Sequence, residues 1–237
     1  MKRRLFTYWE GPKPAYLELC EEIIVKKTTQ QFDYVPITPT NVFDFVDRIP
    51  KEVHDLKLIA HRSDYIRCLL LLKYGGVWLD LDQVIITDLS LVNTLLNSYD
   101  YIGYEWQPEC PEIGFIAVSQ NNSAMADWKE RMDIRLKSTE QLYWPSLGYN
   151  LLWPSIQNAI KQSTIRYCGL DPKTTFCPIH HDCRDWFFDT NLNVLDTSSV
   201  QSVMLYNSLI PDWFKKLTKE QILASNVLLA HLLKTNL

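Results

Sequence analysis

Two aspartates, Asp80 and Asp82, stand two residues apart at the end of an apolar segment that predicts a buried strand over 77–82. The two-residue period of a strand places both carboxylates on one side, away from Leu79 and Leu81. Carboxylates held this close repel one another unless a cation lies between them. Mg²⁺ and Mn²⁺ prefer oxygen ligands and commonly bridge carboxylates to phosphate oxygens. Because D-x-D spacing is common, a solvated strand end is the alternative.

A second polar pair, Asp64 and Arg67, precedes the aspartates on a predicted helix. Ser63 is suited to cap this helix, and Gly75 and Gly76 are suited to end it. A spacing of three residues puts the pair on one helix face. The pair could be a surface ion pair of little energetic value. Alternatively, the carboxylate and the guanidinium could accept and donate hydrogen bonds to the hydroxyls of a ligand beside the D-x-D residues.

Two stretches, residues 60–67 and 70–82, closely resemble the sugar-binding D-x-D region of glycosyltransferases. They read AHRSDYIR and LLLKYGGVWLDLD. Similar sequences occur in glycosyltransferase family 32, in capsular-polysaccharide-synthesis proteins and, more distantly, in the glucosylating clostridial toxins. The segment 7–11, with Pro14 and Cys20, also resembles the opening strand of the capsular group. The resemblance covers the first half of the chain and is thin in the second.

The resemblance implies a GT-A fold, a nucleotide-sugar donor and a bound divalent cation, Mn²⁺ or Mg²⁺. It implies that Asp82 ligates the metal and that Asp80 contacts the metal or the donor ribose. Asp64 and Arg67 would hold the hydroxyls of the donor sugar, and Trp78 would lie near the donor. UDP is favoured over GDP by analogy with these relatives.

The same resemblance places Thr7, Tyr8 and Trp9 at the base and ribose of the donor. Both aromatic residues could instead be core residues, because large aromatic side chains are often buried. The resemblance therefore makes this opening segment a candidate donor contact, with packing as the alternative.

Near the C-terminus, His231 and Lys234 lie one helical turn apart in a predicted amphipathic helix over 219–233. Related enzymes often take a further metal or phosphate ligand from this part of the chain. We expect His231 to be the third metal ligand and Lys234 to contact the donor pyrophosphate. The alternative is a packing helix whose cations lie near its negative pole and whose buried stripe is Leu228, Leu229, Leu232 and Leu233.

The sequence identifies no catalytic base. The related retaining enzymes have no agreed base, and the leaving diphosphate could itself receive the proton of the acceptor. Glu112 and Asp182 are candidates for carboxylates on the acceptor side, but the sequence favours the interpretation of each as a plain loop residue.

The elements that must position these residues alternate between strands and helices, which predicts an α/β fold. With the resemblance, we expect a Rossmann-like GT-A fold in which helices flank a mixed central sheet. No linker or repeat divides the chain. We therefore expect one domain over 1–237, with a nucleotide-sugar-binding half over 1–118 and an acceptor-side half over 119–237. The segments are strands over 4–9, 32–37, 77–82, 99–103 and 114–118, and helices over 15–27, 63–74, 124–136, 147–160 and 219–233.

Composition limits the function further. The 237 residues carry 24 Lys+Arg and 28 Asp+Glu, a net charge of -4. This balance argues against nucleic acid as a partner, because sequence-independent binding to nucleic acid needs a basic excess. No apolar run is long enough for a transmembrane helix, and no apolar segment follows the basic N-terminus as in a signal peptide. We expect a cytoplasmic protein, with association at the membrane surface as an alternative.

The 6 cysteines are scattered and are expected to be reduced packing thiols. Cys177 and Cys183 enclose His180 and His181, but the spacing C-x2-H-H-x-C fits no common structural zinc site.

The leading hypothesis is a metal-dependent, retaining glycosyltransferase that moves a sugar from a nucleotide-sugar to a glycan or lipid-linked saccharide in surface polysaccharide synthesis. An inverting transferase and a non-catalytic nucleotide-sugar or glycan-binding module are the alternatives. The complete set of acidic and basic site residues disfavours the non-catalytic module. A phosphoryl-transfer enzyme is disfavoured because no phosphate-cradling glycine loop is present.

Overall fold

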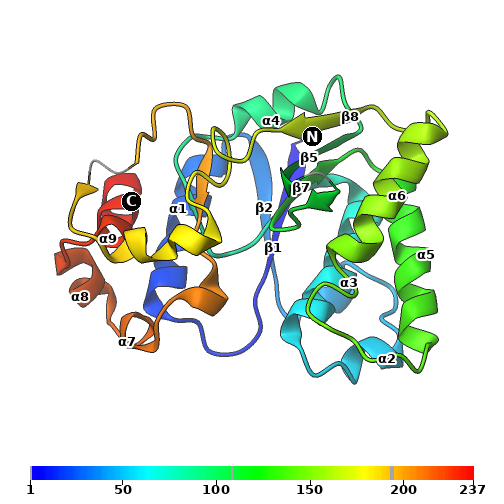
Figure 1. Cartoon of the computed structure of the whole chain (residues 1–237), viewed down its shortest axis with the longest axis horizontal. Helices are drawn as coiled ribbons and strands as arrows, with labels where there is room; N and C mark the ends of the chain where they lie inside the picture. The colour runs from blue at the N-terminus through cyan, green and yellow to red at the C-terminus, as the bar shows by residue number, and fades with distance from the viewer. Residues whose placement is uncertain (1, 108, 193–194) are drawn as a thin grey trace. The chain divides into compact units, whose positions relative to one another are not determined.

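A computed structural model describes residues 2–107, 109–192 and 195–237 (Figure 1). The α-helices are α1 (Ala15–Thr28), α2 (Lys51–His54), α3 (Ile59–Tyr74), α4 (Ser90–Leu95), α5 (Ser123–Lys137), α6 (Tyr149–Lys161), α7 (Asp212–Lys215), α8 (Lys219–Ala224) and α9 (Leu228–Asn236). The strands are β1 (Arg3–Tyr8), β2 (Phe32–Ile37), β3 (Gly76–Leu79), β4 (Gln83–Ile85), β5 (Tyr101–Gln107), β6 (Cys110–Pro111), β7 (Phe115–Val118), β8 (Tyr167–Leu170) and β9 (Ser202–Met204). Short 3-10 helices include η1 (Val42–Asp44), η2 (His181–Phe188) and η4 (Asn207–Leu209).

The main sheet has the strand order β2-β1-β3-β7-β5-β6, and β8 pairs with β5. The sheet is mixed: β1 runs parallel to β3, whereas β7 is antiparallel to both β3 and β5. A separate two-stranded sheet joins β4 to β9. The predicted α/β fold, with a mixed central sheet flanked by helices, is confirmed.

The turn between α3 and β3 brings the polar helix next to the central strand. Gly75 and Gly76 have φ values of 62° and 93°, a backbone region that favours glycine. The prediction of a glycine stop is therefore confirmed. The predicted cap was wrong, because α3 begins four residues before Ser63, after Leu58. The predicted strand over 77–82 was too long, because β3 ends at Leu79.

The chain divides into two compact units, each made of three segments. Unit 1 comprises Met1–Glu10, Val35–Leu79 and Leu91–Leu170. Unit 2 comprises Gly11–Tyr34, Asp80–Ser90 and Asp171–Leu237. The expected organisation, one domain with halves over 1–118 and 119–237, stays a prediction.

Unit 1 contains most of the main sheet. Helix α3 packs on β1 and β3, and α5 packs on both α3 and α6. These helices lie next to one another in Figure 1. The core between helices and sheet is apolar, with large aromatic side chains such as Phe6, Tyr65, Trp78 and Trp128 fully buried. This packing fixes the helix that carries Asp64 and Arg67.

Unit 2 is built around α1, which packs on β4, α8 and α9. Helices α1 and α9 lie side by side although they come from opposite ends of the chain (blue and red in Figure 1). The predicted helix over 219–233 is two helices, because Ser225 is extended (φ -74°, ψ 150°) and ends α8. The predicted stripe of Leu228, Leu229, Leu232 and Leu233 is buried.

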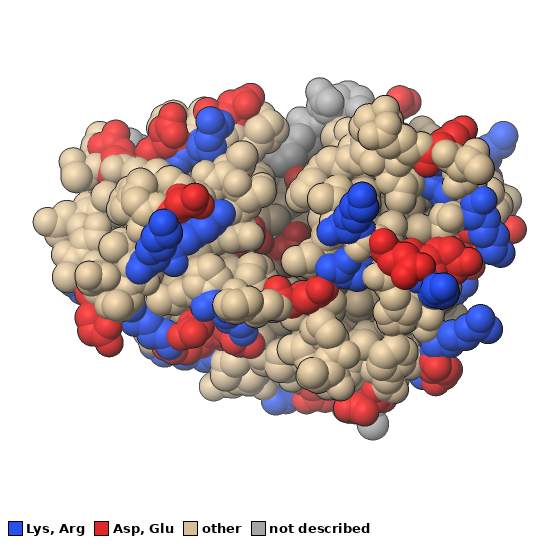
Figure 2. All heavy atoms as spheres, turned by 90° about the horizontal axis from the view of Figure 1, so that it is seen from below, with Lys and Arg blue, Asp and Glu red and all other residues tan. Residues whose placement is uncertain are grey.

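The surface charges are mixed in sign. On the face drawn in Figure 2, Lys and Arg side chains are interspersed with Asp and Glu side chains, in keeping with the small net charge. Among the described residues, no helix combines the length and the apolar character needed to cross a membrane.

Candidate active site

The predicted site residues fall in both units, because the division between the units lies between Leu79 and Asp80. The expected sugar-binding pair on α3, Trp78 and the end of β1 belong to unit 1. The D-x-D residues and the C-terminal candidates belong to unit 2.

Asp64 and Arg67 form a buried ion pair on α3. Each residue is 3% exposed, and Arg67 Nη1 lies 3.6 Å from Asp64 Oδ1. The guanidinium also donates to the carbonyl oxygen of Ile113 (2.6 Å) and lies over the ring of Trp78, 4.6 Å from its centroid. The surface ion pair considered from sequence is therefore excluded, because both groups are desolvated. Burying two charges carries a desolvation cost that their mutual attraction must offset.

The loop opposite Arg67 is shaped by Glu112. Its Oε1 accepts hydrogen bonds from the backbone N–H groups of Ile113 and Gly114 (3.0 and 3.2 Å). These bonds hold the carbonyl group of Ile113 toward Arg67. Glu112 is thus an organiser of its own loop in this structure, and its catalytic role stays a prediction.

The end of β1 carries Thr7, Tyr8 and Trp9. Thr7 and Tyr8 are buried and Trp9 is half-buried. The hydroxyl of Tyr8 donates to Glu10 Oε2 (2.9 Å), and Arg62 binds both oxygens of Glu10 (2.8 and 3.1 Å). Burial opposes ionisation of Glu10, but the hydrogen bonds from Arg62 and Tyr8 outweigh it and lower the pKa of the carboxyl. This network, which was not predicted, fixes the segment that the resemblance assigns to the base and ribose.

In unit 2, Asp80 and Asp82 lie in the connection between β3 and β4 and not within a strand. The Asp82 backbone oxygen accepts a hydrogen bond from Leu205 N (2.9 Å), and its Oδ2 accepts one from Asn207 N (2.6 Å). The side chain of Asn207 is itself hydrogen-bonded to Tyr16. Burial and the charge of Asp82 raise the pKa of the Tyr16 hydroxyl. The Asp82 carboxylate is thus held in place by the segment 205–207.

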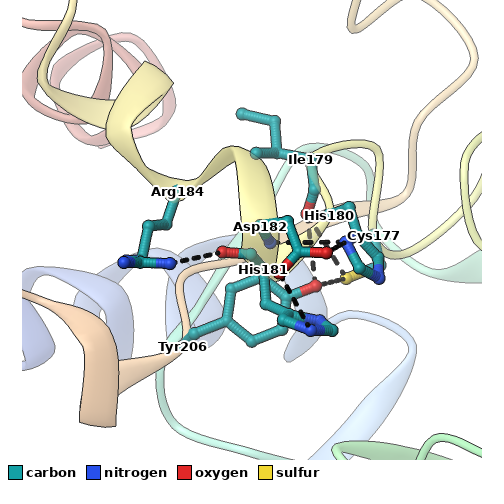
Figure 3. A network of polar contacts seen from close by, with 7 residues as sticks. All are labelled: Cys177, Ile179, His180, His181, Asp182, Arg184 and Tyr206. Atoms are coloured by element: carbon teal, nitrogen blue, oxygen red, sulfur yellow. Dashed lines mark hydrogen bonds and ion pairs between the residues drawn. The ribbon is translucent and has the colours of Figure 1, made fainter.

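Tyr206 connects this segment to the histidine pair (Figure 3). Its backbone is left-handed (φ 55°), an uncommon conformation for an aromatic residue. Its hydroxyl lies 2.8 Å from Cys177 Sγ and donates to the Ile179 carbonyl oxygen (3.2 Å). Its ring meets that of His181 edge-on, with centroids 5.9 Å apart. The two neighbours of Tyr206 in sequence hold Asp82, so the histidines and Asp82 adjoin the same short segment of unit 2.

His180, His181 and Asp182 form a compact polar cluster at the start of η2. Asp182 Oδ2 lies 3.3 Å from His180 Nδ1, and Oδ1 lies 3.5 Å from His181 Nε2 (Figure 3). One ligand atom from each residue lies within 4.8 Å of the others. Within the described part of the chain, this is the one such group of three or more His, Cys, Asp or Glu residues. The carboxylate of Asp182 faces the two imidazoles, and its role on the acceptor side stays a prediction.

His231 lies on α9 and is exposed. It lines a cavity of about 250 Å³ with Leu195, Leu228 and Thr235, whereas neither Asp80 nor Asp82 lines this cavity. The ligand atoms of His231 and the two aspartates do not form a group within 4.8 Å among the described residues. The assignments of His231 to the metal and of the exposed Lys234 to the pyrophosphate therefore stay predictions.

The sequence argument missed the histidines that adjoin the D-x-D segment through Tyr206. The signal in the sequence is the adjacent pair His180 and His181. The pair was interpreted only together with its flanking cysteines, as a candidate zinc site. In the structure the Cys177 thiol is hydrogen-bonded to the Tyr206 hydroxyl and the Ile179 carbonyl oxygen. All six cysteines are free thiols. A histidine pair followed by an acidic residue is a metal-binding pattern that does not need the cysteines.

Comparison with known proteins finds one family model that is similar to part of the chain. Residues 13–102 match the family model described as the glycosyltransferase sugar-binding region containing DXD motif. That segment is similar to a glycosyltransferase sugar-binding region. It includes Asp64, Arg67, Trp78, Asp80 and Asp82, and it spans less than half of the chain. The expectation of a transferase enzyme agrees with this match.

Among solved structures, the chain is similar to the PaToxG glycosyltransferase, with 14% identity, 68% of this chain and 70% of that chain covered, and a TM-score of 0.47. It is similar to the apo form of glycosyltransferase GlyE of Streptococcus pneumoniae TIGR4, with 12% identity, coverage of 75% and 47%, and a TM-score of 0.47. The galactosyltransferase LgtC, solved with donor and acceptor sugar analogs, has 9% identity, coverage of 74% and 76%, and a TM-score of 0.41. No curated protein matches this chain.

Proposed function

We propose that the chain is a metal-dependent GT-A glycosyltransferase that moves a sugar from a UDP-sugar to a glycan or lipid-linked saccharide. We further propose that it retains the anomeric configuration and acts in the cytoplasm in surface polysaccharide synthesis. The observation that carries the proposal is the content of the matched sugar-binding region, which holds both the buried Asp64–Arg67 pair and the D-x-D residues.

The donor set of unit 2 fits a divalent cation. Asp80 and Asp82 offer carboxylate oxygens, which suit Mn²⁺ and Mg²⁺. The third ligand is either His231, as the sequence argument has it, or an imidazole from the pair His180 and His181. When bound, the cation would neutralise charge on the departing nucleoside diphosphate.

The residues of the chain have separate roles in this proposal. Asn207 N and Leu205 N hold Asp82 in one orientation, so its carboxylate is positioned before a cation arrives. In unit 1, Asp64 accepts from a sugar hydroxyl and Arg67 donates to one, while Tyr8 and Trp9 contact the nucleoside. No residue is assigned as a base, in keeping with proton transfer to the leaving diphosphate.

The direct test is release of UDP from a panel of UDP-sugars with Mn²⁺, compared between the native chain and Asp82→Asn. The amide keeps an oxygen that can accept from Asn207 N but loses the negative charge that a hard cation needs. We expect release to fall at least 100-fold with an unchanged circular dichroism spectrum. The exposed Asp44 gives a matched control, Asp44→Asn, that should behave as the native chain. Native turnover by Asp82→Asn would refute the metal role.

The third ligand is tested by Mn²⁺ titration of His181→Ala and His231→Ala, followed by electron paramagnetic resonance. If His181 is the third ligand, as its contact with Tyr206 favours, His181→Ala should bind Mn²⁺ more weakly. If His231 is the third ligand, as the resemblance implies, His231→Ala should bind Mn²⁺ more weakly. If neither variant changes the affinity, both assignments are wrong and carboxylates, phosphate and water hold the ion. The anomeric configuration of the product separates retention from inversion.

A further inference from the structure

Two adjacent aromatic side chains, Tyr143 and Trp144, project from the connection between α5 and α6. Tyr143 is 64% exposed and Trp144 is 62% exposed, whereas Trp78 and Trp128 in the same unit are fully buried. A neighbouring pair of exposed aromatics leaves apolar surface in water, which is a frequent property of binding sites.

The turn that carries these side chains is held rigidly. The Tyr143 carbonyl oxygen accepts hydrogen bonds from Ser146 N (2.9 Å) and from His61 Nε2 (2.9 Å), and Tyr143 N donates to Ser146 Oγ (2.8 Å). The indole of the buried Trp128 donates to the Leu147 carbonyl oxygen (2.8 Å). Because the backbone is already ordered, the aromatic rings can bind a partner without a large loss of conformational entropy.

The turn is attached to the helix of the proposed sugar-binding pair. His61, which holds Tyr143, precedes Asp64 on α3 by one helical turn. At the other end of the turn, a β-carbon placed on Gly148 would lie 3.3 Å from Asp64 Oδ2 and 2.9 Å from Ile113 Cδ1. The backbone of Gly148 therefore approaches Asp64 directly, and the whole arrangement lies within unit 1.

The chemistry around the turn suits a neutral saccharide. Aromatic rings present flat apolar faces on which the C–H faces of sugar rings can lie. The nearby Arg135 is paired with the exposed Glu140 (2.9 Å), and residues 138–148, which form the turn, contain no Lys or Arg, although the exposed Lys137 directly precedes them. A binding site for anionic lipid or phosphate would need unpaired basic residues.

We propose that the turn of Tyr143 and Trp144 is the acceptor subsite, where both rings pack against the sugar rings of a neutral glycan. The proposal rests on the proposed function and specifies its acceptor class. Asp64 would hold the donor sugar on one side of Gly148, and the aromatic turn would hold the acceptor on the other.

The test measures binding to immobilised lactose, maltotriose, cellotriose and chitotriose. We expect the native chain to bind at least one of them and Trp144→Ala to bind it at least 10-fold more weakly. Tyr143→Ala should also weaken binding, and Trp144→Phe should restore much of it. The matched control is Ile134→Ala, an apolar residue of α5 that is 65% exposed and should not matter. Absence of binding by the native chain, or equal binding by Trp144→Ala, would overturn the proposal.

Two further measurements distinguish the acceptor subsite from the proposed transferase function and from a membrane contact. Hydrolysis of UDP-sugar with Mn²⁺ and no acceptor should be unchanged in Trp144→Ala, because the donor residues are intact. If no UDP-sugar is hydrolysed by the native chain while glycan binding still depends on Trp144, the proposed function fails and the glycan site stands. Binding of the native chain to phosphatidylglycerol vesicles that is lost in Trp144→Ala, without glycan binding, would overturn the subsite in favour of a membrane contact.

Discussion

The side chain of Arg67, in the proposed sugar-binding pair, is held in place by three groups. It donates to the Ile113 carbonyl oxygen, faces Asp64 and lies over the ring of Trp78, all in a buried setting. Arginine suits this place because its planar guanidinium can stack on a ring and donate from its edge at the same time. Lysine could supply the charge but not this geometry.

Replacement of Arg67 by alanine should therefore destabilise the fold as well as the site. The change leaves the Asp64 carboxylate buried without its cation, which typically costs about 3–5 kcal/mol. Urea unfolding followed by circular dichroism measures the loss. A matched control on the same helix is Lys73→Ala, because Lys73 pairs with Asp47 at the surface and should contribute little. An equal effect of both changes would contradict the buried-pair interpretation.

Asp64→Asn separates the role of this pair in ligand binding from its role in stability. The amide keeps the shape of the side chain but leaves the buried Arg67 guanidinium without its anion, so the free energy of unfolding should fall, and binding is measured well below the melting temperature of the variant. The amide is also a weaker acceptor for a sugar hydroxyl. Calorimetry should show a loss of about 10-fold for UDP-glucose and little loss for UDP. Equal losses for the two ligands would mark the pair as purely structural.

At this scale the sequence suggested candidate residues but not their surroundings. The type and spacing of Asp64, Arg67 and the D-x-D residues left a solvated strand end and a surface ion pair open, and the resemblance to glycosyltransferases supplied their expected roles. Their partners come from distant parts of the chain: the Ile113 carbonyl oxygen for Arg67 and Asn207 N for Asp82. Backbone groups leave no mark in a sequence, so these contacts could not be predicted.

Among the elements, the connection from α3 to β3 has the strictest sequence requirement. A β-carbon on Gly76 would lie 2.3 Å from the carbonyl oxygen of Arg4 in β1, and one on Gly75 would lie 2.5 Å from Gln120 N. The parallel pairing of β1 with β3 thus depends on the absence of a side chain at this turn. The pattern Y-G-G predicts the turn because glycine tolerates a positive φ. The structure adds a second reason, which is that backbone atoms of Arg4 and Gln120 leave no room for a β-carbon at Gly76 and Gly75.

Gly76→Ala should consequently destabilise the protein by at least about 2 kcal/mol, because a positive φ and a backbone clash add together. Gly11→Ala is the matched control. Gly11 has a similar φ of 90°, yet a β-carbon there would meet no atom within 4 Å. The difference between the two variants in thermal melting isolates the clash with Arg4. Equal melting temperatures would show that β1 and β3 can separate at low cost.

Element boundaries were predictable where the local signal was strong. The strand over 32–37 and the helix starting at Ala15 agree with β2 and α1. The strands β4 and β9 were missed, since each has three residues and forms only by pairing with the other. The break between α8 and α9 was missed because the leucine pattern continues across Ser225.

On the scale of the whole molecule, the C-terminal helix is part of a core. Leu229 and Leu233 of α9 are fully buried, and α9 packs on α1, β4 and η2. Removal of residues from Ala230 onward would therefore take the buried side chains of Ala230, Leu232 and Leu233 out of this core. Single substitutions of His231 and Lys234 are therefore the informative way to examine this helix.

Ligand binding should stabilise the whole chain in a metal-dependent way. A ligand that binds only the folded state, at 100 times its Kd, adds about 2.7 kcal/mol, which corresponds to a rise of about 5–10 °C in Tm for a chain of this length. We expect this rise with UDP plus Mn²⁺, a smaller one with UDP alone, and the smallest with GDP plus Mn²⁺. In Asp82→Asn the increment due to Mn²⁺ should vanish while the increment due to UDP alone remains, because the amide removes a metal ligand and leaves the nucleoside contacts of unit 1 untouched. A rise with UDP that is the same in the presence of Mn²⁺ and of a chelator would show that the D-x-D residues hold the nucleotide without a cation.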